Sequence, residues 1–192
     1  MKNAQKKHKL ELFLPQKKIQ AICRDLADQI NQDYKRFVVG SAEDHTNPDV
    51  IAIGILKGSL FFMADVLRLI DIPFVTDFVK LSSYGKDMEA CGTVTILQDI
   101  STDIRGKHVI IFDEIVDSGR TLAFYIERLK VAGPASVKVC TLIDKKICRF
   151  PDITINADYV GINADEQFLV GYGLDHAEQY RNLPDIYQLK ED

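Results

Sequence analysis

The stretch from residue 109 to residue 121 holds the side chains best suited to chemistry in this chain. An apolar run, 109–112, ends in two adjacent carboxylates, Asp113 and Glu114. Backbone N–H groups and hydroxyls at the start of a helix bind a phosphate, because unpaired amides and the helix dipole both favour an anion. Carboxylates instead suit sugar hydroxyls and Mg²⁺, so the stretch predicts a ligand with phosphate, ribose and metal together. The small and hydroxyl-bearing residues that would hold the phosphate are Asp117, Ser118, Gly119, Arg120 and Thr121.

Two other interpretations of this stretch were weighed against the phosphate site. One is an ordinary helix start in which Asp117 or Ser118 caps the first turn. Two carboxylates directly after a buried strand make that the weaker interpretation. The other is an aspartate-nucleophile phosphatase, which needs a second aspartate two positions after Asp113. That position holds Ile115, so this class is excluded.

The elements that must position these residues alternate between strand and helix. Apolar residues at three- and four-residue spacing predict a first helix that begins near Pro15. Each buried apolar run is then followed by a turn and a helix, with Ser59 as the expected N-cap of one of them. This order is typical of an α/β fold, a mainly parallel twisted sheet flanked by helices, whose ligands sit at the carboxyl ends of the strands. The predicted strands are 50–56, 74–81, 93–97, 108–112 and 137–143, and the predicted helices after the first are 60–70 and 121–132.

Composition sets the outer bounds. With 192 residues, of which 46% are hydrophobic, the chain predicts one folded domain. A net charge of −4 without a Lys/Arg stripe argues against a nucleic-acid partner. The longest apolar runs are too short for a membrane span or a signal peptide, which predicts no membrane association and a cytoplasmic location. The four cysteines have no metal-binding or redox spacing and are expected to be reduced thiols.

Four segments of the chain resemble one family. Residues 112–122 resemble the phosphoribosyl-pyrophosphate signature of the type I phosphoribosyltransferases. Residues 55–59 resemble the first phosphate loop of the hypoxanthine–guanine phosphoribosyltransferases within that class, and 78–85 resemble the start of their mobile catalytic loop. Residues 168–184 are similar to their purine-binding C-terminal segment. The four motifs occur in the family's order between about residues 51 and 183.

The resemblance implies a fold, a reaction and a cofactor. The whole chain, 1–192, would be one domain, with a core at about 45–150 and a small hood built from the N- and C-terminal segments, about 1–44 and 151–192. The expected reaction is transfer of the phosphoribosyl group from phosphoribosyl pyrophosphate to N9 of hypoxanthine, and also of guanine. IMP or GMP and pyrophosphate would be the products, and Mg²⁺ the cofactor. The expected assembly is a homodimer or homotetramer.

Individual roles also follow from the resemblance. Asp117 would be the general base that takes the proton from the purine N7. Ser83 and Tyr84 would belong to a lid over the reacting groups, and Arg181 would neutralise the departing pyrophosphate. The residues expected to bind phosphoribosyl pyrophosphate are Lys57, Gly58, Asp113, Glu114, Asp117, Ser118, Gly119, Arg120 and Thr121, with a non-proline cis peptide at the Lys57–Gly58 turn.

The purine and the metal would draw on the C-terminal part of the chain. Lys145 would donate to the purine 6-oxo group, although Lys146 beside it leaves the register open. Phe168 would stack on the base, with Leu169 next to it. Asp175 would lie at the purine site and, with Asp113 and Glu114, would bind Mg²⁺.

Some alternatives remain open at this stage. The family usually has Glu before Asp at the acidic pair, whereas this chain has Asp113 before Glu114. Neighbouring strand residues point to opposite faces, so which carboxylate faces the ribose is not fixed. The order of preference among hypoxanthine, guanine and xanthine is also open. A nucleotide-sensing RNA-binding regulator on the same fold is the competing class.

Overall fold

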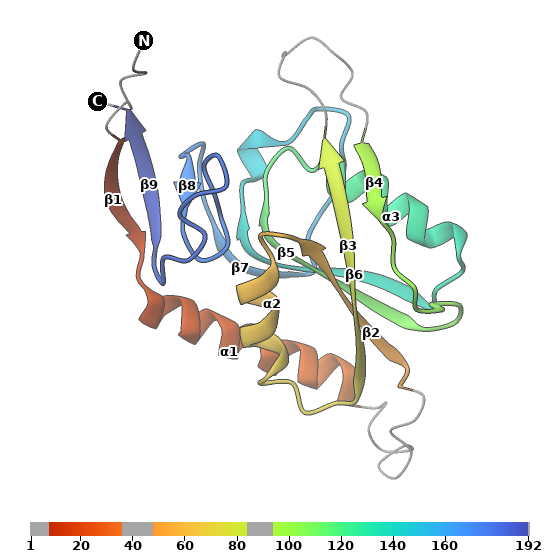
Figure 1. Cartoon of the computed structure of the whole chain (residues 1–192). Coiled ribbons are helices and arrows are strands. Elements are labelled where there is room, and N and C mark those ends of the chain that lie inside the picture. Colours follow the sequence, from red (N-terminus) through yellow and green to blue (C-terminus); the bar gives the residue numbers. More distant parts are fainter. Residues whose placement is uncertain (1–7, 36–47, 84–93, 192) are drawn as a thin grey trace.

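The structure is a computed structural model that describes residues 8–35, 48–83 and 94–191. Within them the chain forms a six-stranded sheet, a separate three-stranded sheet and three α-helices (Figure 1). The elements in chain order are β1 His8–Leu14, α1 Gln16–Tyr34, β2 Val50–Leu56, α2 Leu60–Leu67, β3 Phe74–Ser83, β4 Val94–Gln98, β5 His108–Val116, α3 Arg120–Val131, β6 Ser136–Asp144, the 3₁₀ turn η2 Lys146–Cys148, β7 Tyr159–Asn163, β8 Leu169–Val170 and β9 Ile186–Glu191.

The six-stranded sheet has the order β4-β3-β2-β5-β6-β7. All neighbouring pairs are parallel except β3 and β4, which are antiparallel. The central strands are apolar along nearly their whole length, as a sheet that is covered on both faces requires. The predicted α/β class with a mainly parallel sheet is therefore confirmed.

Alternating residues of the central strands pack into two separate cores. Ala52 and Phe112 face one side, where they join a cluster with α1 and α2. Ile53 and Ile111 face the other side and pack with residues of α3. Because successive strand residues point to opposite faces, one apolar strand can hold helices on both sides of the sheet. The central strands are thereby packed on both faces of the sheet.

The hood consists of β1, β9 and β8, which form the three-stranded antiparallel sheet beside the main sheet (Figure 1). β1 comes from the N-terminal part of the chain, whereas β8 and β9 come from the C-terminal part. This arrangement confirms the hood of terminal segments that the family resemblance implied. The long connection between β8 and β9, residues 171–185, lies at the end of the hood nearest the main sheet.

Several predicted boundaries differ from the structure. β5 extends through the acidic pair to Val116, because Ile115 continues the ladder with Ile143 of β6. α2 ends at Leu67 rather than at residue 70. Ser59 is the N-cap residue of α2 as predicted, but its side chain makes no capping bond, since its hydroxyl donates to the carbonyl of Ile55 at 2.7 Å. The main sheet also includes β7, which lies beyond the predicted core boundary near residue 150.

Among the described residues, no helix has the length and apolar character needed to cross a membrane. The three cysteines in the described part of the chain, Cys23, Cys140 and Cys148, are free thiols.

Candidate active site

The carboxyl ends of β2, β5 and β6 lie at one edge of the main sheet. In the parallel register Gly54 is opposite Phe112, and Val116 is opposite Asp144. The turn after β2 therefore reaches the same edge as the acidic pair and the start of α3. In this turn the peptide bond between Leu56 and Lys57 is cis, in the segment where the resemblance implied such a bond.

Gly58 is where three segments converge. A Cβ on Gly58 would lie 1.6 Å from Oε1 of Glu114, so only glycine leaves room for that carboxylate. A Cβ on Gly173, in the β8–β9 connection, would lie 2.0 Å from the carbonyl oxygen of Gly58. The phosphate turn, the acidic pair and the hood connection are thus in contact. Residues more than a hundred positions apart form one site here.

The two carboxyls of the acidic pair are crowded together, and burial raises the pKa of both. Burial raises the pKa of Glu114 to about 7. Burial, and then the Glu114 charge, raises the pKa of Asp113 well above its usual range. Glu114 faces the Gly58 turn, while the charge of Arg149 acts to lower the pKa of Asp113. Two carboxyls whose pKa values are raised in this way are stabilised in their ionised form by a nearby cation.

The start of α3 forms the predicted phosphate loop. Gly119 is its N-cap, with a φ of 77° that favours glycine, and it carries no side-chain capping bond. Ser118 Oγ accepts a hydrogen bond from the backbone N–H of Arg120 at 3.4 Å. The cap is therefore neither Asp117 nor Ser118, as the ordinary-helix interpretation required. The first turn of the helix leaves backbone N–H groups available to an anion.

Arg149 secures this loop from the side, which the sequence prediction missed. Its Nη1 donates to the carbonyl of Val116 at 2.7 Å and also to the carbonyl of Asp117. Its Nη2 pairs with Asp144, whose side chain is 1% exposed. One guanidinium thus links the end of β5 to the end of β6. The only signal in the sequence is an arginine a few residues beyond a predicted strand end.

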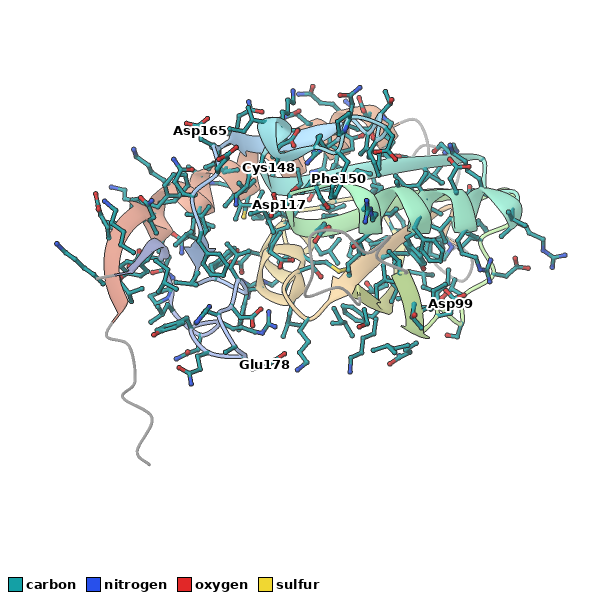
Figure 2. The ribbon with its side chains drawn as sticks, turned by 90° about the horizontal axis from the view of Figure 1, so that it is seen from above. Asp99, Asp117, Cys148, Phe150, Asp165 and Glu178 are labelled. Carbon is teal, nitrogen blue, oxygen red and sulfur yellow. The ribbon has the colours of Figure 1, made fainter. Side chains whose placement is uncertain are left out.

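Asp117 is exposed at the mouth of the site, next to the thiol of Cys148 (Figure 2). Burial raises the pKa of that thiol, and a hydrogen bond to the Asp117 carboxylate raises it further. Both effects favour the protonated form of the thiol. Cys148 is a second residue that the sequence prediction missed.

The two candidate purine lysines differ sharply in burial. Lys145 is only 5% exposed, and its backbone N–H donates to Val116 at 2.9 Å. Lys146 is exposed at the start of η2. A buried ammonium is directed to a fixed acceptor, whereas an exposed one is solvated. Lys145 is therefore the buried one of the two lysines, and its role toward the purine stays a prediction.

Phe168 and Leu169 occupy opposite environments at the start of β8. Phe168 is 51% exposed, and its ring meets the ring of His176 edge-on with centroids 5.5 Å apart. Leu169 is buried and pairs with Gln188 of β9. Phe168 thus has a free aromatic face, while Leu169 belongs to the hood core.

Asp175 and Arg181 are bound to each other in the β8–β9 connection. Arg181 Nη2 lies 2.7 Å from Asp175 Oδ1, and its Nη1 donates to the carbonyl of Gly173 at 2.7 Å. The other oxygen of Asp175 accepts the backbone N–H of Glu178 at 2.8 Å. Both oxygens of Asp175 therefore have partners, and Arg181 reaches the convergence at Gly58 through Gly173.

The remaining predicted site residues are Arg120, Thr121, Ser83 and Tyr84. The guanidinium of Arg120 stacks on the ring of Phe150, 4.1 Å from its centroid, and Thr121 follows in the first turn of α3. Ser83 is the last residue of β3, and its backbone pairs with Val94. Tyr84, the other residue of the predicted lid, lies outside the described residues.

Of the three predicted metal ligands, Asp175 is already paired, which leaves the acidic pair as the candidate donor set. Within residues 8–35, 48–83 and 94–191, no group of three or more His, Cys, Asp or Glu side chains forms a metal site. Mg²⁺ commonly takes one or two carboxylates and completes its shell with water and substrate phosphates. Two crowded carboxyls with raised pKa values fit that pattern.

A mainly parallel sheet with a helix start and an acidic pair at its carboxyl edge is the arrangement expected of a protein that binds a phosphorylated sugar. The phosphoribosyl transferase domain matches residues 11–177 of this chain. The chain therefore belongs to the phosphoribosyltransferase family.

Two relatives are named for transfer to hypoxanthine or guanine. The hypoxanthine phosphoribosyltransferase of Salmonella typhimurium is 39% identical over 178 residues, which cover 93% of this chain and 94% of that protein. The hypoxanthine-guanine phosphoribosyltransferase of Bacillus subtilis is 39% identical and covers 96% of each chain.

Solved structures of hypoxanthine phosphoribosyltransferases are also similar to this chain. The hypoxanthine phosphoribosyltransferase of Staphylococcus aureus is similar with a TM-score of 0.82 and 38% identity, over 94% of this chain and 91% of that one. The Trypanosoma cruzi enzyme in a ternary complex with its substrates has a TM-score of 0.83 at 33% identity, over 93% and 94% of the two chains.

Proposed function

We propose that this protein transfers the 5-phosphoribosyl group of phosphoribosyl pyrophosphate to N9 of hypoxanthine, and also of guanine. The products are IMP or GMP and pyrophosphate. The observation that carries the proposal is the convergence at Gly58, where the Lys57 turn, Glu114 and the connection with Arg181 meet beside the start of α3. The relatives named for hypoxanthine support the choice of base.

The phosphoribosyl pyrophosphate is held along the edge of the sheet. The backbone N–H groups at the start of α3, with Ser118 and Thr121, bind the 5-phosphate. The acidic pair binds the ribose hydroxyls and the metal. Lys57, Gly58 and Arg181 hold the pyrophosphate, since a planar guanidinium offers several donors to phosphate oxygens.

Asp117 acts as the general base. The purine N9 attacks C1′ of the ribose while the bond from C1′ to the pyrophosphate oxygen breaks. The electron pair of that bond leaves with pyrophosphate, and the N7 proton passes to the Asp117 carboxylate. Asp117 is exposed, and Arg149 anchors its backbone. Holding base and ribose in this geometry supplies the remaining rate enhancement.

We also propose Mg²⁺ as the cofactor, bound by Asp113 and Glu114. Glu114 faces the Gly58 turn and is the closer of the two to the pyrophosphate side. Asp175 would join only after it releases Arg181 or the N–H of Glu178. When bound, Mg²⁺ offsets the charge of the pyrophosphate oxygens.

Lys145 and Phe168 select the base. An ammonium can only donate hydrogen bonds, so Lys145 favours the 6-oxo group of hypoxanthine, guanine or xanthine over the 6-amino group of adenine. The half-exposed ring of Phe168 offers a face on which a purine stacks. Leu169 shapes the hood behind that ring.

We further propose a homodimer or homotetramer in the cytoplasm. Leu60 and Phe61 on α2 are 47% and 41% exposed, more apolar surface than one short helix usually leaves in water. Light scattering after size-exclusion chromatography measures the assembly, and a monomer would refute this part.

The activity is tested by product analysis. The purified protein with Mg²⁺, hypoxanthine and phosphoribosyl pyrophosphate should give IMP and pyrophosphate in equal amounts, and EDTA should abolish both. The competing class, an RNA-binding regulator, predicts an RNA mobility shift without turnover. Pyrophosphate release without IMP would mean hydrolysis rather than transfer and would exclude the proposal.

A further inference from the structure

Glu178 lies between the two cations of the proposed pyrophosphate site. Its Oε2 is 2.8 Å from Nζ of Lys57, and its Oε1 is 3.5 Å from Nη2 of Arg181. The side chains of Glu178 and Lys57 are 64% and 53% exposed, so the carboxylate is at the rim of the site (Figure 2). No role assigned above uses this residue.

A tight turn holds Glu178 in this place. His176 and Gln179 exchange backbone hydrogen bonds at 3.2 and 3.0 Å. The two residues between them, Ala177 and Glu178, have φ of 52° and 64°. Positive φ at both central positions is the geometry of a type I′ turn, in which non-glycine residues are uncommon. Together with the bond from its N–H to Asp175, the turn points the Glu178 carboxylate at the cations.

The Glu178 carboxylate contacts the same two cations to which the proposed function assigns the pyrophosphate. It offers one oxygen to an ammonium and the other to a guanidinium, as a phosphate group does. Its pair with Lys57 is solvent-exposed on both sides, its contact with the less exposed Arg181 is long at 3.5 Å, and exposed ion pairs are weak. A doubly charged phosphate therefore displaces it readily, but each binding event must first break the existing pairs.

We infer that Glu178 is an internal counter-ion that competes with the pyrophosphate group for Lys57 and Arg181. The inference rests on the proposed function, because that function places pyrophosphate on these cations. Glu178 lowers the affinity for phosphoribosyl pyrophosphate and for pyrophosphate alike. It also returns to the cations as pyrophosphate departs, which speeds release of that product.

The test uses Glu178→Gln, which keeps the shape and removes the charge. Glu127→Gln is the matched control, because Glu127 forms an equally exposed pair with Lys130 at 2.7 Å on α3. Calorimetric titration with Mg²⁺-pyrophosphate should give a Kd about three- to fivefold lower for Glu178→Gln and an unchanged Kd for the control. Glu178→Asp, which retains the charge, should bind more like the wild type than like Glu178→Gln.

A second readout separates competition from a structural effect. The KM for phosphoribosyl pyrophosphate should fall by a similar factor in Glu178→Gln, while the Kd for IMP, which lacks the pyrophosphate group, should stay unchanged. Pyrophosphate affinity that is unaltered or weakened in Glu178→Gln would overturn the inference, as would equal tightening in Glu127→Gln. A wild-type protein that bound no pyrophosphate and formed no IMP would overturn the proposed function, and the inference with it.

Discussion

At the scale of single residues, the burial of each side chain of the site is determined by the residues packed around it. Lys145 is buried while Lys146 is exposed, and Asp117 has its backbone held by Arg149 but its side chain exposed. Sequence alone predicted the acidic pair and the phosphate loop, because those residues are contiguous. It missed Arg149, Cys148 and Glu178, because each acts through contacts with distant segments.

Replacing Asp117 by Asn should remove the general base and leave the loop intact. The amide has nearly the same shape, and the Asp117 carbonyl that Arg149 binds is unchanged. We expect kcat to fall by about 10²–10⁴-fold, the usual contribution of general acid–base catalysis. Single-turnover rates measure the chemical step, and the Kd for phosphoribosyl pyrophosphate is the control. A variant with an unchanged single-turnover rate would exclude Asp117 as the base.

Lys145→Met should cut kcat/KM for hypoxanthine by at least about tenfold, since a donor to the base is lost. Lys146→Met, one residue away and exposed, is the matched control and should stay near wild type. Steady-state kinetics with hypoxanthine as the varied substrate make the comparison. The reverse pattern would show that the purine lysine is Lys146.

At the scale of elements, the catalytic edge depends on links between strand ends. The helix and strand order was predictable from apolar periodicity, because buried parallel strands need continuous apolar runs. The extension of β5 to Val116 was not, because the ladder of Ile115 with Ile143 outweighs the local polarity of the acidic pair. β1 and β9 escaped prediction as strands for a similar reason: each finds its partner only at the other end of the chain.

Arg149→Met should loosen the phosphate loop without unfolding the sheet. The variant leaves Asp144 and the carbonyls of Val116 and Asp117 without their donor. Breaking a buried ion pair by removing one partner costs about 3–5 kcal/mol, so the unfolding free energy should fall measurably in denaturant titrations. The KM for phosphoribosyl pyrophosphate should rise at the same time. The exposed Arg105→Met, whose partner Asp103 is exposed, is the control and should change neither quantity.

At the scale of the whole molecule, the hood connection contacts a sheet edge that carries two buried carboxyls, and the nearby Arg149 and Arg181 offset their burial only in part. The raised pKa of Glu114, about 7, and that of Asp113 mean that the folded protein holds protons there that the unfolded chain releases near pH 4.5. A raised carboxyl pKa contributes stability below the unfolded value and loses it as the pH rises through the folded value. The metal-free protein therefore carries a cost at neutral pH that a bound cation would remove.

The unfolding free energy of the metal-free protein should show that cost. Between pH 5 and pH 8 the wild type should lose about 1–2 kcal/mol more than Glu114→Gln, which has no proton to release at this position. Chemical denaturation in EDTA at several pH values measures the difference. Parallel pH profiles for the two proteins would show that Glu114 titrates normally.

The central claim is that this protein is a phosphoribosyltransferase for 6-oxopurines, and turnover with a series of bases tests it most directly. Steady-state rates are measured at saturating phosphoribosyl pyrophosphate and Mg²⁺ with hypoxanthine, guanine, xanthine and adenine in turn. We expect hypoxanthine to be used, with kcat/KM for adenine lower by well over tenfold, because Lys145 then faces an amine instead of an acceptor. Adenine used as well as hypoxanthine, or no turnover with any of the four bases, would contradict the account.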